Sequence, residues 1–250
     1  IWPMASMRSK AMANVLVSLS DPLGQYSGFL FNETQVDYDL AKEFFERVLA
    51  SSEGDAISIM NCPAGSLLAQ VSQGYGYLEK IQPNSSILDL HEIPDWEAYH
   101  ASLPRNSRKE RNKRRNKLAS NGSLEYEVVA AGSDRYRELV QTCLDFKQVW
   151  LAETGRRAGI LADIETARYF ADLASETADG EIVSGAVMHC LSVNGAPIGL
   201  EMGMIWNGDY YSYLGAIDWE WRAYSPGKVQ MEFAQRWAKE AGLKRFDFLS

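Results

Sequence analysis

Apolar residues in the first hundred positions follow both helical and extended spacing. Asp37–Ala50 (DYDLAKEFFERVLA) places its apolar side chains on one helical stripe, which predicts an amphipathic helix. Val15–Leu19 and Ala56–Met60 are short apolar runs that contain β-branched residues, and such runs favour strands. These elements indicate a mixed α/β fold for this half of the chain, and they carry no residue pattern typical of catalysis.

Farther along the chain, the apolar spacing changes from helical to alternating. Asp134–Glu153 and Ile164–Thr177 are predicted helices, the first because its apolar and aromatic residues form one stripe. Three predicted strands follow: Ile182–Val193, Pro197–Trp206 and Asp209–Ile217. Asn-Gly dipeptides at 194–195 and 207–208 separate these strands, and they favour the tight turns of hairpins. The pattern therefore predicts an antiparallel meander.

A helix and a last strand are predicted after the meander. Ser225-Pro226-Gly227 suits a helix start, with Ser225 as N-cap and Pro226 at the first helical position. Apolar residues at helical spacing continue to Ala241, and Gly242 is the expected stop. Lys244–Leu249 (KRFDFL) is then predicted to be a strand.

Positive charge is concentrated in one segment. Arg105–Lys117 holds eight basic residues and one acid, so the rest of this chain of net charge −8 carries about −15. A helix here is polar around its circumference, with Leu118 as its only large apolar residue, as expected of a segment that bridges domains. The sequence predicts an N-terminal module over 1–102, a basic connector helix over 103–122 and a C-terminal module over 123–250.

Composition narrows the class of protein without identifying a function. Hydrophobic residues make up 46% and charged residues 23% of the 250 positions, as in folded soluble proteins. The sequence has no apolar run near the roughly 20 residues of a transmembrane helix and no signal-peptide pattern, so a cytoplasmic protein is expected. Its three cysteines lack the spacing of metal ligands, and no metal site is predicted.

The segment Trp219–Val229 (WEWRAYSPGKV) is the candidate cofactor site. Gly227 has no side chain to block a close approach to the start of the helix. The backbone N–H groups of Gly227, Lys228 and Val229, with the helix dipole and the Lys228 charge, favour a pyrophosphate. A well-capped helix without a ligand is the alternative interpretation of the same residues.

A meander followed by such a turn, a helix and another strand resembles the core of the GNAT superfamily. The segments LPRNSRKERNKRRNKLASNG and YSPGKVQMEFAQRWAKEAGLKRFDFL, with Lys147 and Trp150 between them, resemble the bacterial CelD-like acetyltransferase family. That family is linked to cellulose and other exopolysaccharide synthesis and is related to the Fem-type aminoacyltransferases. The resemblance spans roughly Ser20–Ser250 and is strongest after Leu103.

The resemblance implies an α/β (α+β) fold of two GNAT-like modules, each a mixed, mainly antiparallel sheet flanked by helices. It implies an acetyl-CoA or other acyl-CoA site in the second module. The residues assigned to this cofactor are Arg222, Tyr224, Ser225, Pro226, Gly227, Lys228 and Val229. The Q-x-x-G-x-G/A signature of simple GNAT proteins is only partly matched, at Arg222 and Gly227, which leaves the acyl donor open. The family pattern also continues beyond Ser250, so a chain trimmed there is expected, and Ile1 fits a start within a longer protein.

Acyl transfer to an amine requires a base, because only the neutral amine is nucleophilic. In PIGLEMGMIW the large apolar side chains share one strand face, and Glu201 lies on the other between Gly199 and Gly203, which predicts room for a ligand. Glu201 is the first candidate base and Asp218, just after the strand, is the second. Each is alternatively a structural acid. Backbone N–H groups where strands splay are the expected source of carbonyl polarisation.

The acceptor is expected to bind outside the cofactor turn. Arg108, Arg111 and Arg115 fall along one side of the basic helix, an arrangement that suits the phosphates of a nucleotide-linked or lipid-linked acceptor. A solvated helix paired with an acidic surface is the alternative. Further candidates for the acceptor cleft are Lys147, Trp150, Tyr211 and Asp247.

Three functions follow from these observations. The first is an N-acyltransferase that moves an acetyl or other acyl group from coenzyme A to a small-molecule or saccharide amine, such as an amino sugar of exopolysaccharide or cell-envelope synthesis. The second is a Fem-type transferase that uses aminoacyl-tRNA, whose basic helix contacts tRNA. The third is a GNAT-like module that binds a partner without catalysis. The acidic remainder of the chain argues against DNA binding.

Overall fold

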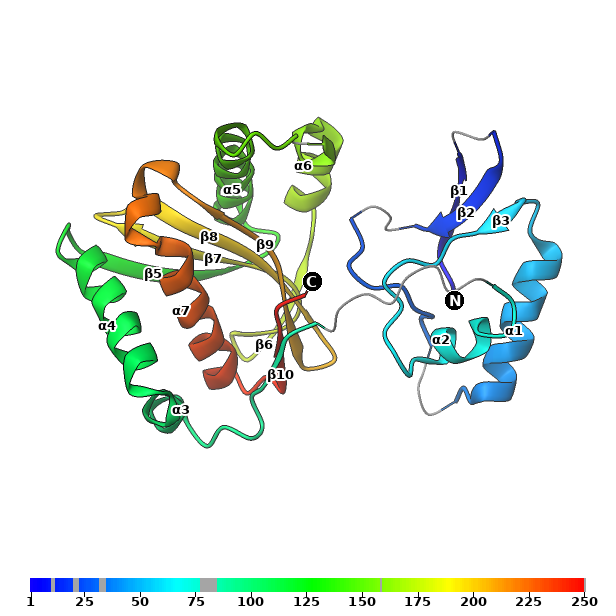
Figure 1. Ribbon diagram of the computed structural model, residues 1–250, viewed down its shortest axis with the longest axis horizontal. Helices are drawn as coiled ribbons and strands as arrows, with labels where there is room; N and C mark the ends of the chain where they lie inside the picture. Colours follow the sequence, from blue (N-terminus) through cyan, green and yellow to red (C-terminus); the bar gives the residue numbers. More distant parts are fainter. Residues whose placement is uncertain (10–11, 20–22, 32–34, 77–84, 158, 250) are drawn as a thin grey trace. The chain divides into compact units, whose positions relative to one another are not determined.

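The computed structural model describes residues 1–9, 12–19, 23–31, 35–76, 85–157 and 159–249. The chain divides into two compact units, residues 1–84 and residues 85–249 (Figure 1). Each unit has its own sheet and its own core, and each is described by itself.

The first unit is a small sheet with two helices. Its elements are β1 (Met4–Arg8), β2 (Asn14–Ser18), α1 (Tyr38–Ser51), β3 (Ala56–Ile57) and α2 (Leu67–Ser72). β1 pairs antiparallel with β2, and β2 pairs in parallel with β3. The core contains Trp2 and Phe45, whose stacked rings lie 5.5 Å apart. The predicted helix begins after Asp37, whose carboxylate accepts the N–H of Leu40 at 3.0 Å.

The second unit is built on a larger mixed sheet. Its described strands are β4 (Ile87–Asp89), β5 (Leu124–Ala130), β6 (Ser175–Ala178), β7 (Glu181–Val193), β8 (Ala196–Trp206), β9 (Asp209–Ile217) and β10 (Arg245–Asp247). Their order is β4-β10-β9-β8-β7-β5, and β6 also pairs with β7. β10 runs parallel to β9, and the other neighbours are antiparallel. Mixed sheets flanked by helices confirm the predicted fold class.

The predicted meander is β7, β8 and β9. Asn194 and Gly195 have φ angles of 52° and 78°, and Asn207 and Gly208 have 51° and 81°. Positive φ at both central residues is the requirement of the tight hairpin turn that Asn-Gly favours. These two dipeptides therefore form the tight turns that join the central strands.

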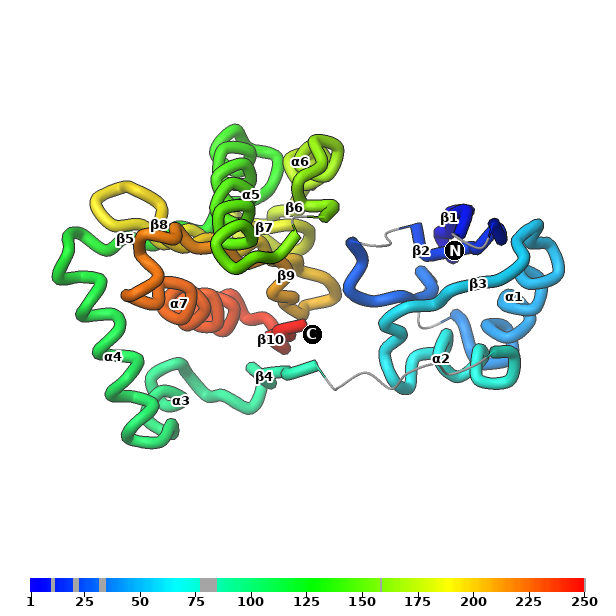
Figure 2. The backbone as a smooth tube through the Cα atoms, turned by 45° about the horizontal axis from the view of Figure 1, so that its top comes forward, coloured from blue at the N-terminus to red at the C-terminus, as the bar shows by residue number. Residues whose placement is uncertain are grey.

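Helices cover both faces of the larger sheet. They are α3 (Trp96–Ser102), α4 (Arg105–Ala119), α5 (Asp134–Glu153), α6 (Ile164–Ala171) and α7 (Pro226–Glu240), with the short 3-10 helices η1 (Gly159–Ala162) and η2 (Trp219–Tyr224). α5 and α6 lie on one face and α7 on the other, with α4 outside α7 (Figures 1 and 2). The core between the sheet and α7 includes Val187, Tyr210, Ala234 and Phe246. None of the described helices combines the length and apolar character needed to cross a bilayer.

The division into units falls after residue 84, whereas the sequence predicted modules that end at residue 102 and a connector helix over 103–122. α3 and α4 belong to the second unit. The physical reason is Leu118, which is fully buried in a cluster with Leu191, Ile198 and Val229. One apolar residue at the end of a highly charged helix therefore attaches that helix to the sheet and α7.

The predicted helix over Ile164–Thr177 is wrong in its second half. α6 ends at Ala171, and Ser175–Ala178 forms β6 at the edge of β7. The N–H of Ala186 donates to the carbonyl of Ala174 at 3.0 Å, so the chain joins the sheet directly after the helix. Pairing with the exposed edge of β7 therefore determines the conformation of Ser175–Ala178, although the local sequence favours a helix.

Candidate functional site

The edge of β9 becomes free where β10 leaves it. β10 pairs with Asp209–Tyr211, and no described strand pairs with that edge over residues 212–217. A register shift opposite Met202 and Gly203 makes Tyr213 a bulge in β9. A free edge presents backbone N–H and C=O groups to an extended ligand, and bulges often lie beside active sites. The split between β9 and β10 is therefore the first feature of the site.

At its C-terminal end β9 leads through η2 into α7. The carboxylate of Asp218 accepts the N–H of Glu220 at 3.0 Å and so caps η2, which the sequence had not predicted. Ser225 occupies the N-cap position of α7 but lies in the left-handed region, with φ of 55°, and its side chain makes no cap hydrogen bond. The prediction that Ser225 caps α7 through its hydroxyl is therefore wrong.

The first turn of α7 packs closely on the end of β9. A Cβ on Gly227 would lie 3.2 Å from Cγ2 of Ile217, so glycine permits this packing. The N–H of Lys228 donates to the carbonyl of Ser225 at 3.1 Å. This N–H was predicted from the sequence to bind a ligand, but it already forms a hydrogen bond within the turn. The side chain of Lys228 is exposed, and that of Val229 is buried in the core.

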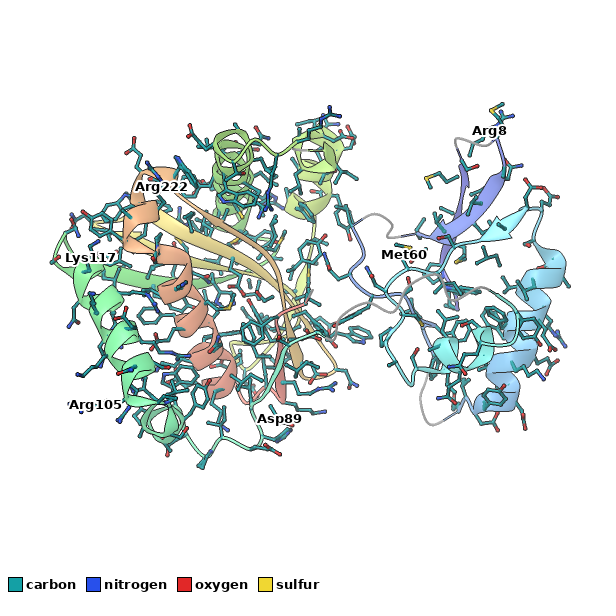
Figure 3. The ribbon with its side chains drawn as sticks, in the orientation of Figure 1. Arg8, Met60, Asp89, Arg105, Lys117 and Arg222 are labelled. Atoms are coloured by element: carbon teal, nitrogen blue, oxygen red, sulfur yellow. The ribbon has the colours of Figure 1, made fainter. Side chains whose placement is uncertain are left out.

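Positive charge gathers around this turn. Nζ of Lys117 on α4 donates to the carbonyl of Ala223 at 3.1 Å and lies 4.5 Å from the ring centre of Tyr224. Arg222 is exposed, donates to the carbonyl of Trp219 at 2.8 Å and stacks on its ring. Figure 3 shows Lys117 and Arg222 at the same end of the second unit. These cations lie beside the positive end of the α7 dipole, which favours an anion there.

Replacing Ser225 with glycine is expected to raise the free energy of unfolding by about 1 kcal/mol, because glycine adopts positive φ without the steric cost of a Cβ. Urea unfolding would measure the gain. Ser225→Ala is the control and should change stability little, because no cap hydrogen bond is lost. A loss of about 1 kcal/mol in Ser225→Ala would contradict this account.

Glu201 is fully buried on the face of the sheet that α7 covers. Its Oε1 accepts the hydroxyl of Tyr210 at 2.8 Å, and its Oε2 has no hydrogen-bond partner among the described residues. Burial raises the pKa of this carboxyl above its ordinary value, while the nearby polar groups of Tyr210, Ser212 and Gln230 oppose the rise. A raised pKa suits a base, but this carboxylate is closed off from solvent.

The glycines beside Glu201 make room for protein groups. A Cβ on Gly203 would overlap the ring and hydroxyl of Tyr210. A Cβ on Gly199 would lie 3.5 Å from Cβ of Gln230 and 3.7 Å from atoms of Pro226 on α7. The prediction that these glycines leave space for a ligand is therefore wrong, because the next strand and α7 fill that space.

His189 lies opposite Glu201 in the neighbouring strand and is also fully buried. Its Nδ1 is 2.5 Å from the hydroxyl of Tyr126. Burial lowers the pKa of His189 to about 3, and burial raises the pKa of Tyr126 well above 10. The phenol is therefore protonated and donates to Nδ1, so the neutral ring carries its proton on Nε2. His189 is therefore part of the core of the second unit.

The two buried groups have opposite effects on stability as pH changes. Because the pKa of the folded Glu201 is raised, it keeps its proton to a higher pH than the unfolded chain does, so its contribution to stability falls as pH rises above 4.5. Between about pH 3 and 6.5 the folded His189 is neutral while the unfolded residue is protonated, so its contribution rises with pH. The two effects partly cancel in the window above pH 4.5.

Glu201→Gln is expected to lose more stability than the parent when pH is lowered from 6.5 to 5. Only the His189 effect then remains, so the free energy of unfolding falls more steeply with decreasing pH in the variant than in the parent. Urea unfolding at both pH values would measure it. Glu125→Gln, at an exposed position, is the matched control and should keep the pH dependence of the parent. An unchanged slope in Glu201→Gln would refute the opposition of these two groups.

On the other face of the sheet, α5 places Lys147 beside the free edge of β9. Nζ of Lys147 donates to the carbonyl of Gly215 at 3.1 Å and lies 4.6 Å from the ring centre of Trp150. The guanidinium of Arg156 lies 4.9 Å from the same ring. The predicted pair Lys147 and Trp150 is thus together, and Arg156 joins it. Sequence reasoning missed Arg156 because it lies in the loop after α5.

Tyr211 and Asp247 face each other in register at the point where β9 and β10 separate. The carboxylate of Asp247 is buried and accepts the N–H of Leu249 at 2.8 Å and the hydroxyl of Ser85. These two predicted acceptor residues are therefore neighbours. The contacts of Asp247 hold the last strand to the segment that enters the unit.

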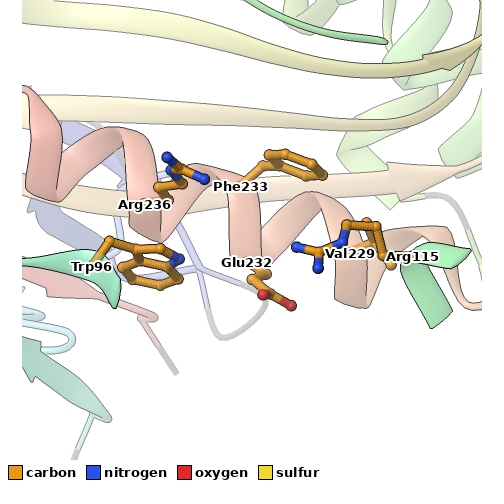
Figure 4. Close-up of a pocket in the computed structure, with 6 residues that line it drawn as sticks. All are labelled: Trp96, Arg115, Val229, Glu232, Phe233 and Arg236. Carbon is orange, nitrogen blue, oxygen red and sulfur yellow. The ribbon is translucent and has the colours of Figure 1, made fainter. Parts of the chain in front are cut away.

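Of the three α4 arginines predicted to bind the acceptor, Arg111 and Arg115 lie toward α3 and α7. Arg111 is 3.9 Å from Glu232 and 5.9 Å from the ring centre of Tyr99. Arg115 lines a small pocket between α4 and α7, shown in Figure 4 with Trp96, Val229, Glu232, Phe233 and Arg236. Arg108 is half-buried, with no hydrogen-bond partner for its Nε among the described atoms. For Arg111 this geometry matches the alternative interpretation, a basic helix paired with an acidic surface.

The predicted site residues therefore fall into three places. Along β9 and its ends lie the turn predicted to bind the cofactor, Asp218 and Tyr211, with Asp247 opposite Tyr211 on β10 and with Lys147 and Trp150 beside the strand. Glu201 lies under α7 on the opposite face. The arginines lie between α4 and α7. Across the described residues, no group of three or more His, Cys, Asp or Glu side chains is placed to hold a metal ion.

Comparisons with known proteins agree with this architecture. Residues 105–250 match the family model described as an acetyltransferase (GNAT) domain. The comparison with curated proteins found no match.

Three solved structures share the fold at low sequence identity. FemX is 14% identical, with 99% of this chain and 80% of that chain covered and a TM-score of 0.56. The C-terminal domain (DUF2156) of a putative lysylphosphatidylglycerol synthetase from Agrobacterium fabrum is 13% identical, with 99% and 70% covered and a TM-score of 0.55. L-PGS from Bacillus licheniformis is 14% identical, with 98% and 67% covered and a TM-score of 0.53. Because the family model covers more than half of the chain, the chain belongs to the acetyltransferase (GNAT) domain family.

Proposed function

We propose that the second unit is an N-acyltransferase whose acyl-CoA lies along the free edge of β9, with its pyrophosphate at the turn Tyr224–Lys228. The proposal is carried by one observation: the free edge of β9 is continuous in the chain with the turn that begins α7. The unpaired edge runs over residues 212–217 and leads through η2 to the N-terminus of α7. An extended thioester ligand can bond to such an edge as an added strand does, while its phosphates meet the helix dipole, Lys117 and Arg222.

The backbone of β9 supplies the proposed polarisation of the thioester carbonyl. The bulge at Tyr213 interrupts the ladder on one side of β9, and the split removes strand neighbours from the other. N–H groups in such a place can donate to an oxyanion that forms when the amine attacks. Glu201 has a structural role in this proposal, because it lies under α7 and is bonded to Tyr210. Asp218, which directly follows the free edge of β9 and is partly exposed, is the candidate base.

The acceptor that we propose is the amine of a saccharide or another small molecule in exopolysaccharide or cell-envelope synthesis. This assignment is supported by the resemblance of the Arg105–Gly122 and Tyr224–Leu249 segments to the CelD-like family. The proposed location is the cytoplasm, where acyl-CoA is available.

A second candidate is a Fem-type transfer from aminoacyl-tRNA. Its support is the shared fold with FemX and the exposed basic residues of α4. The exposed ones are Arg105, Lys109, Lys113, Arg115 and Lys117. A polyanion bound by these side chains loses affinity steeply as salt concentration rises.

Titration calorimetry with acetyl-CoA, free coenzyme A and aminoacyl-tRNA tests both candidates. The acyl-CoA proposal expects micromolar-range binding of acetyl-CoA and of coenzyme A, followed by turnover with an amine panel. Tight, salt-sensitive binding of aminoacyl-tRNA with no binding of acetyl-CoA would establish the second candidate instead. Binding of neither donor would overturn both and would favour a non-catalytic module.

A further inference from the structure

Two cations share one aromatic ring beside the free edge of β9. Lys147 comes from α5, and Arg156 follows the end of that helix, where its N–H bonds to the carbonyl of Leu151 at 2.8 Å. The ammonium and the guanidinium lie 4.6 and 4.9 Å from the ring centre of Trp150. The indole therefore holds both positive charges at one place on the surface.

These two cations have no acidic partner among the described residues. Lys147 uses one of its three N–H donors on the carbonyl of Gly215 at 3.1 Å. The side chain of Arg156 makes no hydrogen bond or ion pair within the described part of the chain and is exposed. Several donors in this pair therefore have no acceptor within the described part of the chain.

The environment of Lys147 shows the same lack of negative charge. Burial lowers its pKa, and the nearby Arg156 lowers it further, while the Cys143 thiol acts in the opposite direction. Some other arginines of this unit do have a carboxylate partner, such as Arg135 with Glu127 at 2.6 Å and Arg245 with Asp209. Two neighbouring cations without an acid repel each other, and an anion placed between them removes that cost.

We propose that Lys147 and Arg156 form a subsite for an anionic group, a phosphate or carboxylate, carried by the acceptor substrate. Arg156 provides a planar fork of donors that matches either oxyanion, and Lys147 adds a point charge. Trp150 holds both cations beside its ring. The subsite adjoins Gly215 on the free strand edge, where the acyl group is proposed to lie. That the anion belongs to the acceptor rests on the proposed function.

A binding experiment tests the subsite without any need for turnover. Inorganic phosphate is titrated into the full chain while the indole N–H resonances are followed by NMR, with Trp150→Phe used to assign Trp150. The Trp150 resonance is expected to shift with a saturable dependence on phosphate. Arg156→Gln should raise the apparent Kd at least tenfold. Arg157→Gln, the neighbouring exposed arginine with the same change in charge, is the matched control and should leave the Kd within about twofold.

Each outcome bears on the proposal. Loss of affinity in Arg156→Gln alone supports it, and Lys147→Met should reproduce that loss. Equal losses in Arg156→Gln and Arg157→Gln would mean a general charge effect and would overturn it, as would the absence of a Trp150 shift in the parent. Repeating the titration with sodium acetate distinguishes a carboxylate from a phosphate subsite. Gly227→Glu keeps the shift if the phosphate occupies this subsite, and loses it if the ion binds at α7.

A kinetic comparison then tests whether the anionic group is part of the acceptor substrate. With acetyl-CoA as donor, the KM for glucosamine 6-phosphate should be at least tenfold below the KM for glucosamine. Arg156→Gln should remove most of this difference between the two KM values, while kcat changes less than threefold. Phosphate binding without this ratio would refute the assignment to the acceptor. Failure of acetyl-CoA to bind at all would overturn the proposed function, while the phosphate titration would still decide the subsite.

Discussion

Gly227→Glu should weaken the binding of coenzyme A roughly 100-fold while the protein stays folded. The new carboxylate enters the first turn of α7, where a bound pyrophosphate would lie, and both its volume and its charge oppose the phosphates. Negative side chains in the first turn of a helix stabilise the helix itself. The loss of binding is therefore expected without a matching loss of helix content. Calorimetry measures the affinity, and circular dichroism measures the fold.

A graded series at Gly227 separates bulk from charge. Gly227→Ala adds only a Cβ, which would lie 3.2 Å from Cγ2 of Ile217, so a modest loss of roughly threefold is expected. Gly227→Gln has the size of glutamate without its charge and should fall between the alanine and glutamate variants. If Gly227→Glu binds coenzyme A as tightly as the parent, the pyrophosphate does not bind at this helix.

Leu118→Ala should lower the free energy of unfolding by about 2–5 kcal/mol, the usual cost of truncating a fully buried leucine. Leu118 has no exposed surface and packs with Leu191, Ile198 and Val229. Lys113→Ala on the exposed side of the same helix is the control and should stay within about 0.5 kcal/mol. Urea unfolding compares the two variants.

This substitution also tests the place of the basic helix. A helix that only connects two modules would hold Leu118 in contact with solvent, and its truncation would then cost less than about 1 kcal/mol. A cost in the range expected for a core leucine agrees with α4 as a layer of the second unit. Burial of Leu118 then also holds the backbone of the preceding residue, Lys117, in the position from which its ammonium donates to the carbonyl of Ala223.

Elements whose signals are local could be predicted from the sequence. The helix over Asp134–Glu153 is found with its predicted bounds, because its apolar stripe is long and the hydroxyl of Ser133 accepts the N–H of Tyr136 at 3.1 Å. The hairpins followed from two Asn-Gly dipeptides. β5 was missed although its sequence, LEYEVVA, alternates, because it follows directly on the charged helix.

Features that depend on distant residues could not be predicted in the same way. The spacing of PIGLEMGMIW predicts which face Glu201 takes, but the ring that covers Gly203 comes from Tyr210 on the next strand. Ser225 has a favourable cap side chain, yet the entry from η2 sets its backbone at positive φ. Arg156 reaches Trp150 because the chain turns back after α5, and no spacing rule for a regular element includes that turn.

The crossover from β9 through α7 to β10 has an evolutionary consequence. Residues 209–247 contain both strands that separate at the proposed cofactor site and the helix between them. The proposed donor site is therefore almost entirely encoded in one uninterrupted stretch of sequence, to which α4 adds Lys117. The proposed acceptor contacts Lys147, Trp150 and Arg156 are encoded upstream, in α5 and the loop after it. Under the proposed function, mutation or recombination in that upstream stretch changes which amine is modified while the donor site is inherited unchanged.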